Sequence, residues 1–386
     1  MVQAPIRLDP SRRSSEANGL GKKLHSLIVG QDEAIQAIVG VYQTYLTGMN
    51  PPGRPIANLL FLGPTGSGKT RIVEAVAECL LGNSRAVVKI DCGEFQHGHE
   101  IAKLIGSPPG YLGHRETRPI LSQDALDQYF TPSTRLSLVL FDEIEKASDA
   151  LWNLLLGILD KGALTLGDSH RVDFSRAMIF LTSNLGAAEM SALFSPRLGF
   201  AANSPQAGTT EQLENRIGRS AEEAARRKFS PEFINRLDKV VTFKPLGTGQ
   251  LRQILDIELK MVQERIFQAG PERSFIFTAT NPVKELLLEE GTDLKYGARH
   301  LKRAIERLLV QPVSNLIASE QVRGGDCIRI DLDRSLGRLN FTKEVEGLPS
   351  QTMMALAGLA LPMPAVAMSH FVPLETVKTW KSTFFK

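Results

Sequence analysis

The sequence that decides the fold is Gly63-Pro64-Thr65-Gly66-Ser67-Gly68-Lys69-Thr70. It matches the pattern GxxxxGK[ST] and lies directly between an apolar run at 56–62 and a helical pattern at 69–81. Glycines let backbone N–H groups approach phosphate oxygens, and the start of a helix adds partial positive charge. The stretch therefore predicts a phosphate-binding loop between a buried strand and a helix.

The end of this loop and a second segment predict the chemistry of an ATP and Mg²⁺ site. Lys69 would neutralise the β and γ phosphates, and the Thr70 hydroxyl would bind Mg²⁺. The segment 138–143, Leu-Val-Leu-Phe-Asp-Glu, is an apolar strand that ends in two carboxylates. Open α/β sheets bind ligands at this edge, so Asp142 is expected in the Mg²⁺ shell. Glu143 is expected to orient and deprotonate the attacking water.

A third apolar run, Phe180-Leu181-Thr182-Ser183-Asn184, ends in an amide. Asn184 has two readings at this point. It is either a hydrogen-bond partner of the water or the γ phosphate, or an asparagine that only forms the turn after a strand.

Apolar runs alternate with helical patterns on both sides of these motifs. Strands are expected at 56–62, 86–90, 136–141 and 177–182, and helices at 69–81, 120–129 and 150–159. This alternation predicts an α/β fold with a parallel sheet and helices on both faces. After residue 245 the pattern changes to helices at 251–267, 283–290 and 299–317 with short strands at 275–277 and 328–330. That pattern predicts a smaller, mainly helical α+β domain.

The chain is therefore expected to have four parts. These are a mobile N-terminal arm at 1–20, a large domain at 21–245, a small domain at 246–335 and an uncharged, Met-rich extension at 336–386. No Asp, Glu, Lys or Arg occurs from Gly347 to Leu374. Its apolar part, Met353–Met368, is shorter than the roughly 20 residues of a membrane span and contains prolines. Contact with a partner or subunit, a disordered tail and a membrane segment stay open for it.

The composition limits which classes of partner and which cellular compartment are expected. In 386 residues, 45 Lys and Arg against 42 Asp and Glu give a net charge of +3, so no nucleic-acid partner is expected. With 42% hydrophobic and 23% charged residues, wholesale disorder is excluded. Three cysteines without a CxxC pair favour a reducing compartment. The N-terminus has no apolar signal region, so a cytoplasmic protein without a membrane partner is expected.

Together these motifs resemble the Clp family of AAA+ ATPases, in particular the second ATPase module of ClpB, ClpA and ClpC-type protein unfoldases. The similarity extends from about residue 27 to about residue 331. Ile28-Val29-Gly30-Gln31 is similar to the adenine-side segment of the family, which implies that Val29 contacts the nucleotide. The segment 141–147 looks like the Walker B signature, and Asn184 falls at sensor 1.

Two arginines match family positions that contact the γ phosphate. The segment 230–238, Ser-Pro-Glu-Phe-Ile-Asn-Arg-Leu-Asp, resembles the one that carries the arginine finger, here Arg236. The segment 297–303 resembles sensor 2, with Arg299 reaching the γ phosphate from the small domain. A guanidinium can stabilise the charge that develops on the transferred phosphoryl group. An arginine finger that acts on a neighbouring subunit requires a ring, which the resemblance implies is a homohexamer.

The segment Gly106-Ser107-Pro108-Pro109-Gly110-Tyr111-Leu112-Gly113 is too rich in Gly and Pro for a helix or a central strand. Its residues alone also allow an ordinary loop whose Tyr111 packs into the core. In the family this position is the central-pore loop, which implies that Tyr111 and Leu112 grip unfolded polypeptide. The hairpin turn at 167–170 falls where the family has a second pore loop.

Leu198-Gly199-Phe200 resembles the aliphatic–Gly–aromatic tripeptide with which some family members dock on a ClpP-type peptidase. An ordinary loop anchored to the core is the alternative. If the resemblance holds, a ClpP-type peptidase is a candidate partner.

The resemblance as a whole implies an ATP-dependent protein unfoldase or remodelling chaperone. It would be a single-ring AAA+ motor that uses ATP and Mg²⁺ to thread unfolded or misfolded polypeptide through a central pore. Two alternatives stay open. One is the unfoldase subunit of a two-component Clp-type protease. The other is a non-threading AAA+ switch that acts on a fixed partner or a nucleic acid, against which the aromatic pore loop and the lack of a basic extension argue.

Overall fold

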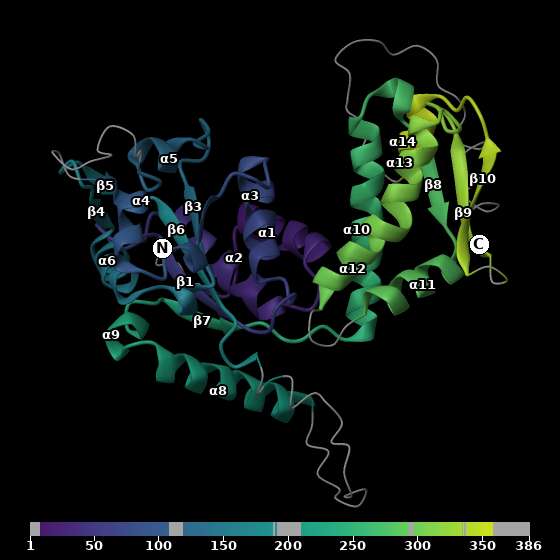
Figure 1. Ribbon diagram of the computed structural model, residues 1–386. Coiled ribbons are helices and arrows are strands. Elements are labelled where there is room, and N and C mark those ends of the chain that lie inside the picture. Colours follow the sequence, from purple (N-terminus) through teal and green to yellow (C-terminus); the bar gives the residue numbers. More distant parts are fainter. Residues whose placement is uncertain are drawn as a thin grey trace, which may run out of the picture. The chain divides into compact units, whose positions relative to one another are not determined.

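A computed structural model describes residues 8–107, 119–187, 190, 210–292, 297–333, 335 and 337–357 (Figure 1). The chain forms two compact units. The first, the large unit, comprises Met1–Gly247 and Leu294–Gly297, and the second, the small unit, comprises Thr248–Asp293 and Ala298–Lys386.

The large unit is built on a parallel sheet of five strands in the order β2-β3-β6-β1-β7. The strands are β1 (Ala57–Leu62), β2 (Val88–Asp91), β3 (Ser137–Asp142), β6 (Ala177–Ser183) and β7 (Lys239–Thr242). The first four confirm the predicted strands. β7 was not predicted, because this short edge strand begins with a lysine and has only one buried residue.

Two separate hydrophobic clusters cover the two faces of this sheet. Because side chains alternate along a strand, Leu60 and Leu62 of β1 face one cluster and Leu59 and Phe61 face the other. The first cluster includes the buried residues of α6 (Asp149–Lys161), and the second those of α1 (Ser15–Leu27), α2 (Asp32–Leu46) and α3 (Lys69–Leu81). The predicted α/β fold with helices on both faces is confirmed.

The remaining elements of the large unit are short, except for one helix. They are α4 (Ala102–Ile105), α5 (Gln123–Asp127), α8 (Thr210–Lys228), α9 (Pro231–Ile234), β4 (Ala163–Thr165) and β5 (Arg171–Asp173). β4 and β5 pair antiparallel, which confirms the predicted hairpin. α8 was not predicted, because the buried positions among its described side chains are small alanines (Ala221, Ala224, Ala225) and not large apolar residues.

The prediction of a mobile arm over residues 1–20 is wrong from residue 15 onward. α1 begins at Ser15, and the Ser14 hydroxyl accepts a hydrogen bond from the Ala17 N–H group, at 3.1 Å, as an N-cap. Ala17, Leu20 and Leu24 are buried against the core. Their spacing is helical, but the lysines and glycines between them made the segment look aperiodic.

The small unit combines five helices and three strands within the described residues. They are α10 (Thr248–Gln268), α11 (Asn281–Gly291), α12 (Ala298–Ile305), α13 (Gln311–Ala318), α14 (Ser350–Leu356), β8 (Ile276–Ala279), β9 (Cys327–Asp333) and β10 (Arg338–Val345). A π-helical turn, Glu306–Val310, joins α12 to α13, so the helix predicted at 299–317 is continuous. The predicted mainly helical α+β domain is confirmed.

The predicted boundary of the extension at 336 is also wrong. β10 pairs antiparallel with β9, and β9 pairs parallel with β8, so residues 338–345 belong to the sheet of the small unit. Lys343 of β10 lies 3.0 Å from the buried Asp326 carboxylate. Because this strand carries charges, only the segment after Glu346 fits the description of an uncharged extension. α14 follows in it and buries Met353.

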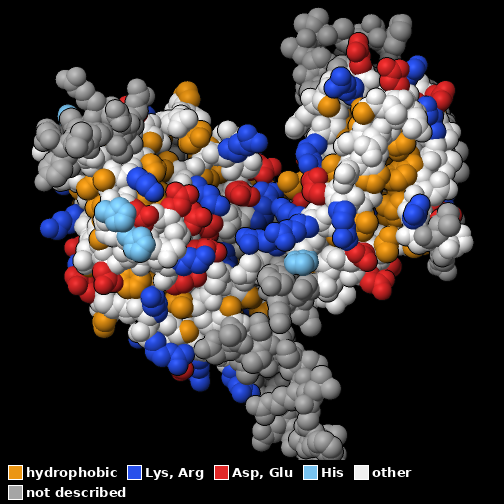
Figure 2. Space-filling view, viewed as in Figure 1, with side chains coloured by type: hydrophobic (Ala, Val, Ile, Leu, Met, Phe, Trp, Pro, Cys, Tyr) orange, Lys and Arg blue, Asp and Glu red, His pale blue; other side chains and the backbone are white. Residues whose placement is uncertain are grey.

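Charges of both signs are interspersed on the surface. Figure 2 shows basic and acidic side chains on the visible face of each unit, as the nearly balanced sequence indicates. No helix among the described residues is both long and apolar enough to cross a bilayer.

Candidate nucleotide-binding site

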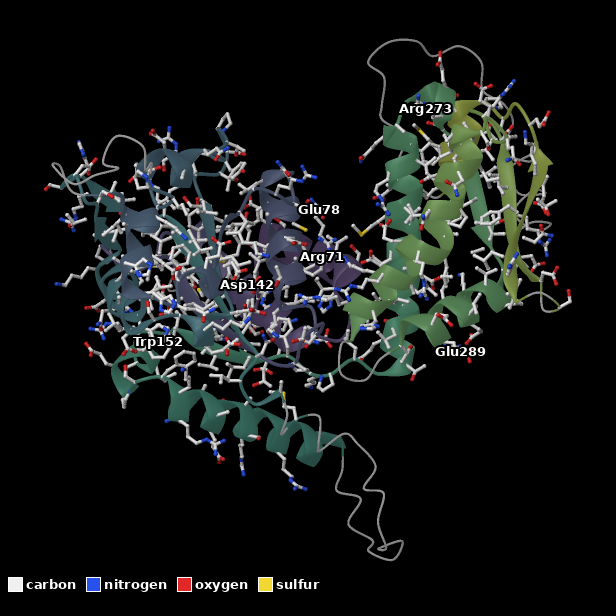
Figure 3. All side chains as sticks on the ribbon, in the orientation of Figure 1. Arg71, Glu78, Asp142, Trp152, Arg273 and Glu289 are labelled. Carbon is white, nitrogen blue, oxygen red and sulfur yellow. The ribbon has the colours of Figure 1, made fainter. Side chains whose placement is uncertain are left out.

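The strand order brings the three predicted motifs to one edge of the sheet. β6 lies between β1 and β3, and all three strands are parallel. The phosphate loop after β1, the carboxylates at the end of β3 and Asn184 after β6 therefore meet at the carboxyl edge. Figure 3 labels Asp142 within the large unit.

The backbone of residues 63–68 forms a loop whose conformation favours glycine at positions 63, 66 and 68. Gly66 and Gly68 have φ angles of 77° and 102°, in the range that side chains disfavour. A Cβ atom on Gly63 would lie 2.6 Å from the carbonyl oxygen of Phe243. Gly68 is the N-cap of α3 and provides no side-chain cap for the helix start. The Ser67 hydroxyl is buried and has no hydrogen-bond partner among the described residues. A bound phosphate fits this cradle of backbone groups.

Lys69 is buried at the centre of the loop, with 8% of its surface exposed. Its ammonium donates hydrogen bonds to the carbonyl oxygens of Gly63 (2.7 Å) and Pro64 (2.9 Å). It also donates to the side-chain oxygen of Asn184 at 2.9 Å. A buried ammonium requires such acceptors, and this arrangement holds the cation beside the cradle that would receive the phosphates.

Thr70 and Asp142 provide oxygen atoms suited to Mg²⁺. The Thr70 hydroxyl lies 3.4 Å from both carboxylate oxygens of Asp142. Mg²⁺ is commonly held by one or two carboxylates together with substrate phosphates and waters, so this pair fits an ion that arrives with ATP. No cluster of three or more His, Cys, Asp or Glu residues that would hold a metal occurs in the described part of the chain.

Thr182 and Lys89 orient Asp142, and sequence reasoning missed both. The Thr182 hydroxyl donates a hydrogen bond to Asp142 Oδ1, and Lys89 Nζ lies 3.1 Å from Oδ2. The signal for Thr182 was available, because it lies at the carboxyl end of β6, two positions before the candidate Asn184. Lys89 comes from the neighbouring strand β2, and nothing in the sequence pairs it with Asp142.

Glu143 adopts an unusual backbone conformation, with φ 57° and ψ 48°. For a residue other than glycine this left-handed conformation costs free energy, and such residues cluster at functional sites. Its N–H group donates to the Thr182 hydroxyl at 3.1 Å, which fixes this turn. Its carboxylate pairs with Lys146 of the following 3₁₀ turn. Hydrogen bonding to Glu143 raises the pKa of Lys146, so the lysine stays charged.

Asn184 connects the two halves of the site. Its side-chain oxygen accepts hydrogen bonds from Lys69 and, at 3.3 Å, from the Thr65 hydroxyl. Its side-chain amide donates to Glu143 Oε1 at 3.4 Å, and its backbone N–H donates to Glu145 Oε1 at 3.0 Å. These contacts favour the functional reading of Asn184 over a simple turn former.

Val29 lies in the short connection between α1 and α2. The side chain of Gln31, two residues further on, donates a hydrogen bond to the Ser67 carbonyl of the phosphate loop. The connection therefore lies beside the loop. The nucleotide contact of Val29 stays a prediction.

The two predicted arginines lie outside this network. Arg236 follows α9, whose Ser-Pro start confirms the expected helix start. Its guanidinium pairs with Glu232 at 3.0 Å and lies 3.9 Å from Asp160. Arg299 lies on α12 of the small unit. The role of Arg236 in a neighbouring subunit and the γ phosphate contact of Arg299 stay predictions.

Of the two predicted pore loops, the turn at 167–170 is described in full, whereas the 106–113 loop is described only at residues 106–107. Tyr111 and Leu112 lie outside the described residues, as do Leu198, Gly199 and Phe200. The N–H group of Gly167 donates to the Ile105 carbonyl at 2.8 Å, and a Cβ atom on Gly167 would lie 2.5 Å from the Gly106 carbonyl oxygen. The base of the 106–113 loop and the turn of the β4–β5 hairpin are therefore in direct contact.

Two family models match consecutive parts of the chain, one in each unit. Residues 54–240 match the family model described as AAA domain (Cdc48 subfamily), and residues 246–330 match the C-terminal, D2-small domain of ClpB protein. Chaperone protein ClpC3, chloroplastic, of Oryza sativa subsp. japonica is 36% identical over 345 residues, which are 89% of this chain and 35% of that protein. Chaperone protein ClpB 1 of Thermosynechococcus vestitus is 36% identical over 85% of this chain and 35% of its own length.

Solved structures agree with these matches. The Hsp104:casein complex of S. cerevisiae in its extended conformation superposes with a TM-score of 0.69 at 28% identity, covering 86% of this chain and 53% of that one. The chain spans about a third of the length of these curated relatives. With both ATPase-module domains matched in order and the loop, Asp142, Glu143 and Asn184 assembled at one sheet edge, this chain belongs to the Clp family of AAA+ ATPases.

Proposed function

We propose that this protein is an ATP-dependent protein unfoldase or remodelling chaperone, whose motor threads polypeptide through a central pore. The observation that carries the ATPase part is the network through Asn184, which joins Lys69 of the phosphate loop to Glu143. The side-chain amide of Asn184 thus hydrogen-bonds both to Lys69, the cation expected to bind phosphate, and to Glu143, the candidate base. The relatives named as Clp chaperones and the casein complex of Hsp104 support a polypeptide substrate.

Each residue of the site has a defined part in ATP hydrolysis. The glycine loop and Lys69 would bind the phosphates, and Thr70 and Asp142 would hold the Mg²⁺ ion, which neutralises phosphate charge. Thr182 keeps Asp142 and the Glu143 backbone in place. Glu143 would accept the proton of the attacking water, and Asn184 would orient that water or the γ phosphate.

Glu143 must leave its partner before it can act as a base. In the structure its carboxylate pairs with Lys146 and receives a weak bond from Asn184. An ion pair at this half-exposed position contributes little free energy, so reorientation toward a water beside the γ phosphate costs little. Asn184 contacts both Lys69 and Glu143, and it can sense a phosphate that displaces the Lys69 ammonium.

A homohexameric ring is part of the proposal. Arg236 would complete the site of a neighbouring subunit. Its position at the end of a short helix supports this role. In the structure its side chain is 22% exposed and its guanidinium pairs with Glu232 and Asp160, so it would have to leave these carboxylates to reach the neighbouring site. A monomer with full ATPase activity would contradict it.

The contact between the loop bases supports polypeptide movement. Gly167 of the hairpin donates a hydrogen bond to Ile105, the last residue of α4 before the 106–113 loop, so the bases of the two loops are linked. The hairpin follows α6, which begins after the Glu143 segment. A shift of Glu143 and Lys146 can therefore be passed along α6 to both loops.

Tyr111→Ala is expected to keep most of the ATPase activity and to lose substrate unfolding by at least about tenfold. The aromatic ring supplies apolar area that grips many sequences without a specific partner, and it takes no part in phosphate chemistry. Unfolding of a tagged fluorescent protein, measured beside phosphate release, checks this. Tyr111→Phe retains the ring and is the matched control, expected to unfold normally. If the alanine variant unfolds the substrate at the wild-type rate, Tyr111 does not grip the polypeptide.

The peptidase partner stays a sequence prediction, because Leu198-Gly199-Phe200 lies outside the described residues. A cytoplasmic, reducing location is likewise proposed on the sequence. Cys79, Cys92 and Cys327 are unpaired in the structure, which is compatible with it.

A further inference from the structure

Gln31 is a buried amide that bonds to two distant segments. It is the N-cap residue of α2, and 4% of its surface is exposed. Its side-chain NH₂ group donates to the Ser67 carbonyl at 3.1 Å and to the Lys244 carbonyl at 2.9 Å. Its side-chain oxygen accepts from the Lys244 N–H at 3.1 Å. Both amide hydrogens and the amide oxygen are therefore used.

Gln31 joins the phosphate loop to the segment that connects the two units. Ser67 belongs to the phosphate loop, between two glycines. Lys244 belongs to residues 243–247, which follow β7 and lead into α10 of the small unit. This segment is called the linker below. One side chain thus holds the loop and the linker at a fixed separation.

The start of the linker also contacts the other end of the phosphate loop. The Phe243 N–H donates to the Leu62 carbonyl at 2.7 Å, and the Phe243 carbonyl packs against Gly63 so closely that a Cβ atom there would lie 2.6 Å away. The Phe243 ring packs on Phe61 with ring centroids 5.0 Å apart. The linker is therefore fastened to both ends of the loop, by Phe243 at Gly63 and by the Gln31 side chain at Ser67.

We propose that Gln31 is a positioning residue that couples the phosphate loop to the linker, so that a nucleotide bound in the loop orders residues 243–247. The inference rests on the proposed ATPase function and adds a route from the nucleotide to the small unit. A phosphate bound by the loop N–H groups would hold the Ser67 peptide in one position. The Gln31 side chain, which bonds to the Ser67 carbonyl, would then hold the Lys244 backbone in one position as well. Coupling of this kind is reciprocal, so losing it also weakens nucleotide binding.

The test compares how nucleotide changes amide hydrogen exchange of the linker in the full-length chain. Gln31→Met keeps the length of the side chain and removes all three hydrogen bonds. Gln263→Met is the matched control in the small unit. Gln263 is also buried, donates to the Phe275 carbonyl at 2.7 Å and accepts from the Phe277 N–H at 3.0 Å.

Saturating ADP is expected to slow exchange of the 243–247 peptide about tenfold in the wild type and in Gln263→Met. In Gln31→Met the ADP-induced change should vanish, and the Kd for ADP should rise about tenfold, since buried carbonyls lose their donors. Gln31→Glu keeps an acceptor for the Lys244 N–H but has no NH₂ donors. Gln31→Glu should also lose the ADP-induced protection of the linker, and it replaces Gln31→Met in the test if that variant does not fold.

The outcomes separate the inference from the function on which it rests. Full linker protection by saturating ADP in either Gln31 variant would overturn the coupling. So would equal loss of protection in Gln263→Met, which would indicate a general loss of stability. Normal ADP binding by the wild type without linker protection would refute the coupling alone, whereas no binding of ADP or ATP would refute the proposed ATPase as well.

Discussion

Glu143→Gln is expected to lower kcat for ATP hydrolysis by roughly 10²–10⁴-fold, the range that general-base catalysis contributes. The amide retains the size of the side chain and can still contact Asn184, but it cannot accept the proton of the attacking water. Nucleotide binding should change little, because the phosphates are held by residues 63–70 and not by Glu143. Phosphate release gives kcat, and titration of a fluorescent nucleotide gives Kd.

Glu94→Gln is a matched control for this change. Glu94 is exposed at the end of the 3₁₀ turn Cys92–Glu94, in the same unit. The Glu94→Gln variant should hydrolyse ATP at the wild-type rate. A Glu143→Gln variant with unchanged kcat would show that Glu143 is not the base.

Lys69→Ala is expected to weaken ATP and ADP binding by about 100-fold, which corresponds to about 3 kcal/mol. The ammonium is the cation of the phosphate cradle, and hydrogen bonds to charged groups are roughly twice as strong as neutral ones. Its removal also leaves the Gly63 and Pro64 carbonyls without this donor. Titration with a fluorescent nucleotide measures the loss.

Thermal unfolding gives a second readout for Lys69. Saturating ATP should raise the Tm of the wild type and of Lys161→Ala, a control on the exposed end of α6. The same ATP concentration should raise the Tm of Lys69→Ala much less, because the stabilisation by a ligand of the folded state falls as its Kd rises. Equal stabilisation of all three proteins would place the nucleotide elsewhere.

The sequence predicted those features that local patterns specify. β1, the glycine loop and α3 follow one another without a gap, so the strand, the phosphate loop and the first residue of the helix could all be predicted. Asp142 and Glu143 were predicted because acids end an apolar strand, and parallel strands bring such ends together. For the same reason Asn184 was a candidate before its contacts were known.

Other features depend on contacts between distant residues. Gln31 and Lys244 are 213 positions apart, and Lys89 reaches Asp142 from a neighbouring strand. Their pairing follows from the sheet order, which no local pattern gives. α1 and α8 bury small or sparse apolar residues, and β10 carries charges on an edge strand, so hydropathy alone missed them.

The central claim is that ATP hydrolysis drives the threading of polypeptide. Its most direct test is the fluorescence of a tagged, folded fluorescent protein mixed with the chain and ATP. The account predicts a loss of fluorescence with the wild type, and none with Glu143→Gln or when ATP is replaced by ADP. A wild-type protein that hydrolyses ATP yet leaves the fluorescence unchanged would contradict threading and favour a switch that acts on a fixed partner.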